Sequence, residues 1–194
     1  SLEGEESRSI AEVLVPVLED KQSDVARAAR IVLSGFKDHL NRLPLLEVLV
    51  EGKKDRRIAA ILHAASDMRW KDFRDAGVNY LESNDEECRL WAVNLCGNLK
   101  NVLSIEAIAQ LLAGDDNGII RAAAVQALED MGIAHEDVAA PPLIAALEDE
   151  LSAVNVAACV ALRTVRSKQA IGPLVGLLGT ATGRLAEEVW PTLV

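Results

Sequence analysis

The sequence predicts an all-α fold in which about six helical hairpins stack as an α-solenoid. Three observations predict it: an apolar pattern with helical spacing recurs along the chain, a second apolar pattern keeps step with the first, and turn-forming residues separate the two. The composition agrees, because half of the residues are hydrophobic and only 3% are aromatic. A palette of Ala, Leu, Val and Ile suits closely packed helices.

The first pattern places an apolar residue at an anchor position, a small or apolar residue at +4 and an apolar pair at +7 and +8, as in Ile120, Ala124, Ala127 and Leu128. These offsets lie on one side of a helix with 3.6 residues per turn, so each copy predicts the amphipathic second helix of a hairpin. The anchors are spaced by 32, 31, 32, 34 and 31 residues, and they are Val25, Arg57, Cys88, Ile120, Val154 and Leu185.

The second pattern predicts the first helix of each hairpin. These segments end at leucines spaced by 31, 32, 31, 35 and 31 residues, namely Leu18, Leu49, Leu81, Leu112, Leu147 and Leu178. We expect Pro44, Pro142 and Pro173 early in their helices, where a missing amide donor costs little. Between the two helices of a hairpin we expect turns, whose Ser, Asp and Asn side chains can cap the next helix, at residues 21–24, 83–85, 115–118 and 180–183.

Charge and cysteine content restrict the setting and the partners. With 20 Lys and Arg against 30 Asp and Glu the net charge is -10, which repels polyanions, so nucleic acid is an unlikely partner. No apolar run approaches the roughly 18 residues that cross a bilayer, so we expect no membrane insertion. The three cysteines lack metal-type spacing and fall in apolar segments, which favours a reducing, cytoplasmic location.

Three segments carry a resemblance to a known family: GIIRAAAVQALEDMG (118–132), APPLIAALEDE (140–150) and QAIGPLVGLLG (169–179). They resemble the HEAT-repeat superfamily, particularly the short bacterial HEAT-like repeats of phycobilisome lyases. The resemblance covers nearly the whole chain and is weakest over residues 56–80. It implies a right-handed α-α superhelix, with the second helices lining a concave face, that serves as a binding scaffold. It also implies that Arg89 and Arg121, which follow their anchors, pair with acidic residues of a neighbouring turn.

Offsets +2, +5, +6 and +9 of the second helices point away from the packing stripe and predict the concave surface. We expect an apolar groove for a partner helix or an extended peptide, with Trp91 as its best exposed aromatic contact. The alternative is that +5 and +6 contact the adjacent repeat. The candidate partner-binding residues are Arg27, Arg30, His63, Leu90, Trp91, Val93, Asn94, Val125, Gln126, Val156, Val160 and Arg163.

One dense basic cluster, made of Lys53, Lys54, Arg56 and Arg57, stands out in an acidic chain. Such a run is usually a solvated turn. The alternative is an anion patch that contacts a phosphate or an acidic peptide, because local charge here opposes the field of the whole molecule.

The expected function is a non-catalytic scaffold or adaptor for a protein or peptide, without a cofactor. His39, His63 and His135 belong to no His-x-x-x-His pair, and the sequence has no Gly-rich phosphate loop or nucleophile elbow, so we predict no metal site and no enzyme. The first alternative, from the family resemblance, is a bilin lyase subunit or lyase-like chaperone. The second is a HEAT-like DNA-binding protein or alkylpurine glycosylase, which charge and the few aromatic residues disfavour.

For domain organisation we predict a flexible segment over residues 1–8, with Ser1 and Leu2 as candidate cloning residues, followed by the repeat array over 9–194. The apolar end of the chain, Trp190 to Val194, lacks the polar face of a capping repeat, so we expect a module of a longer chain. The oligomeric state stays open.

Overall fold

The computed structural model describes residues 42–50, 57–179, 181 and 183–193, together with residues 13, 14, 17, 28, 29, 31 and 32. The chain divides into two compact units, residues 1–95 and 96–194. Throughout the described ranges the regular elements are helices, with no strand among them. The predictions for the segment 1–8, the turn at 21–24, Leu18 and Val25 lie outside the described residues.

The first unit holds hairpins made of long second helices and shorter first helices. α3 (Leu43–Val50) packs against α4 (Arg57–Asp67) and α5 (Arg74–Val78). The hydroxyl of Tyr80 donates a hydrogen bond of 2.5 Å to the carbonyl oxygen of Leu49. Trp70 and Phe73 are buried where the repeat pattern is weakest, so these rings fill an irregular junction. The elements are α3 (Leu43–Val50), α4 (Arg57–Asp67), η2 (Lys71–Phe73), α5 (Arg74–Val78) and α6 (Glu86–Asn98), the last of which ends in the second unit.

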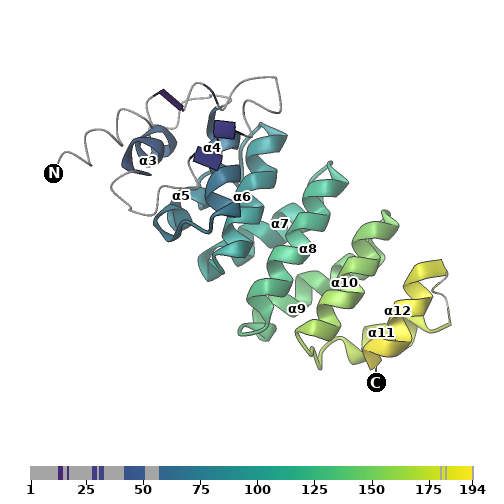
Figure 1. The fold of residues 1–194 in the computed structure, drawn as a ribbon. Coiled ribbons are helices and arrows are strands. Elements are labelled where there is room, and N and C mark those ends of the chain that lie inside the picture. Colours follow the sequence, from purple (N-terminus) through teal and green to yellow (C-terminus); the bar gives the residue numbers. More distant parts are fainter. Residues whose placement is uncertain are drawn as a thin grey trace. The chain divides into compact units, whose positions relative to one another are not determined.

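The second unit repeats the hairpin three times. Its second helices α8, α10 and α12 lie side by side, and α7 and α9 pack against each other in a layer behind them (Figure 1). Its elements are η3 (Val102–Ser104), α7 (Ile105–Gly114), α8 (Gly118–Gly132), α9 (Glu136–Ala145), η4 (Ala146–Glu148), α10 (Ser152–Thr164), α11 (Ile171–Leu177) and α12 (Gly183–Leu193).

Burial follows the predicted register. The anchor, +4, +7 and +8 residues of α8 and α10 are each at most 3% exposed. Of the leucines that end the first helices, Leu49, Leu81, Leu112 and Leu147 are buried, whereas Leu178 is 46% exposed. Each hairpin therefore shields its neighbour's apolar side chains from water. The predicted all-α solenoid class is confirmed.

Two second helices, α6 and α8, begin with side-chain caps where the turns at 83–85 and 115–118 were predicted. The Oδ1 atom of Asp85 accepts a hydrogen bond of 3.0 Å from the amide of Cys88, and Oδ1 of Asn117 accepts one of 2.9 Å from the amide of Ile119. These bonds satisfy amides that have no partner within the helix. In these two hairpins the sequence of the turn thus fixes where the second helix starts, whereas α10 begins after Leu151 without a side-chain cap.

Three second helices end in the same way, with a basic residue in the left-handed region. Arg69, Lys100 and Arg166 have φ of 50°, 50° and 56°, and each lies twelve residues after its anchor. At Lys100, the amide of the next residue, Asn101, donates to the carbonyl of Cys96 at 2.9 Å, which closes a Schellman motif. A positive side chain at this position also faces the negative end of the helix dipole.

The prolines are placed less regularly than predicted. Pro44 and Pro173 are early in α3 and α11 as expected, but Pro142 lies in the second half of α9, next to Pro141. Two missing amide donors weaken this helix. The chain then tightens into the 3-10 turn η4.

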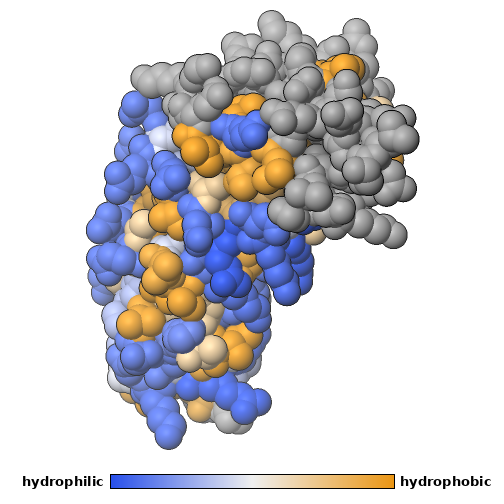
Figure 2. Space-filling model, turned by 90° about the vertical axis from the view of Figure 1, so that its left-hand side faces the viewer, coloured by the Kyte–Doolittle hydropathy of each residue, from blue (hydrophilic) through white to orange (hydrophobic). Residues whose placement is uncertain are grey.

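The outer surface alternates between polar and apolar residues. On the face drawn in Figure 2, hydrophobic residues form patches set among hydrophilic ones. Among the described residues, no helix is both long and apolar enough to span a bilayer.

Candidate functional site

The second helices separate into buried and accessible offsets. Position +5 is buried in every copy within α6, α8 and α10, with Val93 at 0%, Val125 at 1% and Cys159 at 0% exposure. The Sγ atom of Cys159 lies 3.4 Å from Oγ1 of Thr192 on α12, so +5 contacts the following helix. Burial at +5 in these three helices is what the alternative of a contact with the adjacent repeat expects for this offset.

Positions +2 and +6 remain accessible. Leu90 and Asn94 are half-buried on α6, Gln126 is exposed on α8, and Val156 and Val160 are half-buried on α10. Within each unit these side chains are therefore available to a partner.

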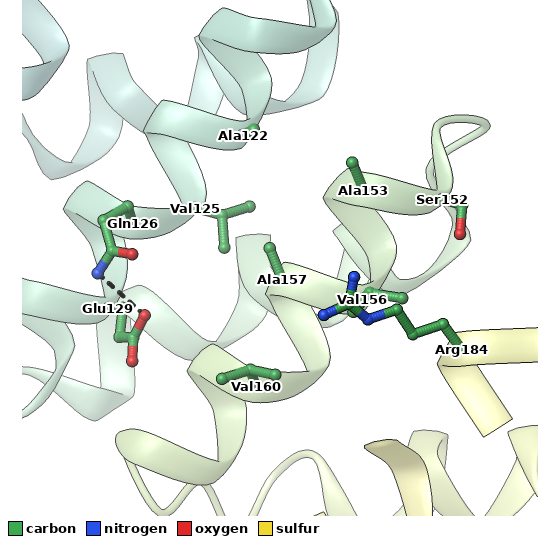
Figure 3. A pocket seen from close by; sticks show the side chains of 10 residues that line it. All are labelled: Ala122, Val125, Gln126, Glu129, Ser152, Ala153, Val156, Ala157, Val160 and Arg184. Atoms are coloured by element: carbon green, nitrogen blue, oxygen red, sulfur yellow. Dashed lines mark hydrogen bonds between the residues drawn. The ribbon is translucent and has the colours of Figure 1, made fainter. Parts of the chain in front are cut away.

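A trough with apolar and polar lining runs between α8 and α10, with a volume of about 480 Å³ (Figure 3). Its walls carry small and branched apolar side chains, and polar groups stand at its margins. The residues that line it are Ala122, Val125, Gln126, Glu129, Ser152, Ala153, Val156, Ala157, Val160 and Arg184. We call this set the trough.

The polar groups of the trough come from opposite margins. On the α8 side, Nε2 of Gln126 donates a hydrogen bond of 3.1 Å to Oε2 of Glu129 (Figure 3). On the other side, Arg184 at the start of α12 reaches toward Val156 on α10 (Figure 3). The trough thus has an anionic margin and a cationic margin with apolar walls between them.

The structure brings four predicted residues together in the trough, namely Val125, Gln126, Val156 and Val160. Arg163, also predicted for this face, is exposed, and its Nη1 lies 3.0 Å from Oε2 of Glu188 on α12. This ion pair links the two helices beside the trough, so Arg163 does not line it.

Sequence reasoning missed Arg184 and the small residues of α10, above all Ala153 and Ala157. Arg184 and Ala153 both precede their anchors by one position, and both line the trough. Extending the predicted surface to offset -1 would have found Arg184 and Ala153, whereas Ala157 lies at offset +3.

The first unit holds the other described candidates. The ring of His63 on α4 stacks on Trp91 of α6, with centroids 3.5 Å apart and planes 10° apart, and Nε2 of His63 lies 3.2 Å from Oδ2 of Asp67. On α6, the side-chain amide of Asn94 donates to the carbonyl of Leu90 at 2.9 Å. Trp91 therefore packs between helices of its own unit.

The remaining candidates cannot be placed. Arg27, Arg30, Lys53, Lys54 and Arg56 lie outside the described residues, as does the side chain of Arg57. Close to the predicted anion patch in sequence, Arg69 and Lys71 are exposed. The patch stays a prediction.

Arg121 performs the role implied for the basic residue after an anchor. Its guanidinium donates to both carboxylate oxygens of Asp149, at 2.8 and 3.1 Å, and to the carbonyl of Asp115 at 2.8 Å. Burial acts to raise the pKa of Asp149, but the bonds from Arg121 and the Leu151 amide outweigh it and lower that pKa. The hydrogen bond to Asp149 raises the pKa of Arg121. The contact joins neighbouring hairpins and is structural.

Arg89 repeats half of this arrangement. Its Nη1 donates to the carbonyl of Ser83, six residues earlier, at 2.8 Å. Asn155 occupies the equivalent position in the next copy, and its amide likewise reaches back six residues to the carbonyl of Asp149, at 3.2 Å. The residue after the anchor thus ties the start of its helix to the preceding turn.

Nucleophilic and metal-binding groups give no reactive cluster in the described part of the chain. There, no set of three or more His, Cys, Asp or Glu side chains could hold a metal ion. All three cysteines are buried. Burial, reinforced by Asp85, raises the pKa of Cys88 to about 11, so this thiol stays protonated at neutral pH.

Comparison with known proteins agrees with this architecture. A family model described as HEAT repeats matches residues 43–129 and 75–150, which together span more than half of the chain. A solved structure described as an engineered protein has a TM-score of 0.61 and 18% identity, covering 95% of both chains, and that identity bears on the fold alone. No curated protein matches the sequence. The buried register, the repeated Arg contacts and the family match lead to one conclusion: this chain belongs to the HEAT-repeat family.

Proposed function

We propose that the protein is a non-catalytic interaction scaffold that binds another protein on the face formed by its second helices. Repeats of this family generally act as protein-interaction scaffolds. The observation that carries the proposal is the trough between α8 and α10, because its apolar walls are accessible although the same helices bury their anchor stripes. Accessible apolar side chains rimmed by polar ones often mark a protein-interaction site.

The surrounding charge supports a protein partner. The net charge of -10 disfavours nucleic acid, and the trough contributes only one cation, Arg184. The phycobilisome-lyase resemblance and a bilin lyase activity stay predictions, as does the DNA-binding alternative.

Site-specific photo-crosslinking tests the proposal. A photoreactive amino acid is introduced at Gln126 or Val160 in the trough, and at Gln110, exposed on α7, as the matched control. In cells of the source organism, we expect the trough positions to give a discrete crosslinked protein and Gln110 to give none. Equal crosslinking from Gln110, or crosslinking only from Gln110, would place the binding surface elsewhere.

A further inference from the structure

We propose that the occupant of the trough is an amphipathic α-helix with one cationic flank and one anionic flank. This inference rests on the proposed function and specifies the partner's chemistry. Two observations support it: the trough offers no backbone hydrogen bonds to a partner, and its two margins carry opposite charges.

A helix fits the trough because it needs no backbone partners. The amides and carbonyls in the middle of α8 and α10 are already bonded within those helices. The polar groups that line the trough are therefore side chains, those of Gln126, Glu129, Ser152 and Arg184. An extended peptide would lose water from its backbone groups without gaining matching hydrogen bonds, at a cost for each unpaired group. A helix satisfies these groups internally.

The walls also have a helical period. Val125 and Glu129 on α8, and Ala153, Val156 and Val160 on α10, recur every three or four residues, so the trough follows the helix axes. Small side chains such as Ala157 let a third helix approach and pack its ridge between the two. The occupant should therefore present Ala, Val or Leu side chains at i, i+3, i+4 and i+7.

The margins set the charges of its flanks. Glu129 borders the trough on the α8 side, and Arg184 borders it on the α12 side (Figure 3). Among the described residues, Glu129 and Arg184 form no ion pair, either with each other or with another charged side chain. A bound helix with a Lys or Arg flank toward Glu129 and an Asp or Glu flank toward Arg184 would neutralise both.

Three synthetic peptides test this inference by fluorescence anisotropy. Each is a labelled helix of about 18 residues, long enough to form a helix. All share one face of Ala, Val and Leu. The first has a Lys flank and a Glu flank, the second has Lys on both flanks, and the third has Glu on both.

Charge reversals in the full chain give the specificity pattern. Arg184→Glu should lower the affinity for the first peptide, the mixed one with a Lys flank and a Glu flank, by about three-fold to ten-fold. It should raise the affinity for the all-Lys peptide. Glu129→Lys should lower the affinity for the mixed peptide and raise the affinity for the all-Glu peptide. The double variant should bind the mixed peptide again with the affinity of the wild type. The peptide can bind in the opposite direction, which brings each of its flanks to the other margin.

Matched controls separate this effect from the overall charge. Lys168→Glu and Glu148→Lys make the same charge changes at exposed residues that do not line the trough. They should leave the preference among the three peptides unchanged. If the controls shift binding as much as the trough variants, or if the double variant does not restore the mixed peptide, the assigned flanks are wrong. Crosslinking from the trough without binding of any peptide would overturn the helical occupant and leave the proposed function standing.

Discussion

The guanidinium of Arg121 and the carboxylate of Asp149 form a two-pronged hydrogen-bonded pair between α8 and the turn that precedes α10. Asp149 also accepts a bond of 2.8 Å from the amide of Leu151, just before α10 begins. One carboxylate thus holds the neighbouring hairpin and organises the start of its second helix. This relationship links the register of one repeat to the next.

Replacing Asp149 should weaken this link. Asp149→Asn is expected to lower the free energy of unfolding by about 1–2 kcal/mol, since solvent screens part of a charge-assisted hydrogen bond. Urea unfolding followed by circular dichroism measures the loss. Glu148→Gln, at an exposed neighbouring carboxylate, is the control and should change stability little. Equal stability of the two variants would show that the pair contributes nothing.

The same pair predicts a pH dependence. Because the pKa of Asp149 is lowered in the folded state, its contribution is fully present above its unfolded pKa of about 3.9. It is lost as the pH falls through the folded value. Below about pH 3.9 the wild type should therefore lose part of its advantage over Asp149→Asn, and unfolding curves at pH 7 and about pH 3 compare the two proteins. A constant difference at both values would contradict the lowered pKa.

Close packing between α6 and α8 predicts a cost for a single methyl group. A Cβ at Gly97 would lie 2.8 Å from the backbone and side chain of Ala127, so Gly97→Ala should destabilise by about 1–3 kcal/mol. Gly114 ends α7 with nothing within 4 Å of an added Cβ, and Gly114→Ala should be neutral or stabilise by about 0.4–1 kcal/mol. Thermal unfolding of the two variants measures whether each substitution lowers or raises the stability of the protein. Two variants of equal stability would show that the helices do not approach this closely.

The stacked rings of His63 and Trp91 should be energetically coupled. A double-mutant cycle with His63→Ala and Trp91→Ala is expected to give a coupling of about 0.5–1.5 kcal/mol, typical of ring pairs. A control cycle combines Trp91→Ala with Glu82→Ala, at an exposed residue, and the effects of these two substitutions on stability should be additive. Coupling of similar size in both cycles would indicate a global effect and not the stack.

Buried thiols predict slow chemical modification. Cys88, Cys96 and Cys159 are buried, and burial raises the pKa of both Cys88 and Cys159. A disulfide reagent at pH 8 should therefore label none of the three in the native protein within minutes, and all three in denaturant. Rapid labelling of native protein would contradict their burial.

Much of the fold could be predicted because apolar spacing alone encodes it. Residues such as Ile120 and Leu128 are buried wherever the helix forms, and Asn117 marks its start with a cap. The family resemblance supplied the role of Arg121, although its partner Asp149 lies 28 residues away.

The site was harder to predict because it depends on the direction of neighbouring helices. Spacing on one helix separates the packing stripe from the rest, but it does not tell which remaining side a neighbour covers. Val125 was therefore grouped with Gln126, although the next hairpin buries the first and leaves the second exposed. Arg184 comes from a third helix, α12, so the periodicity of α8 and α10 does not predict that it lines the trough.

The most direct test of the account compares Val125→Asp with Val156→Asp by circular dichroism and by crosslinking to the partner. Val125 is 1% exposed, so a carboxylate there should destabilise the fold by about 3–5 kcal/mol. Val156 is half-buried in the trough, so Val156→Asp should keep its helical signal and melting temperature while losing the crosslink from Gln126. If Val156→Asp crosslinks like the wild type, or if Val125→Asp is as stable as Val156→Asp, the division between stacking and binding positions is wrong.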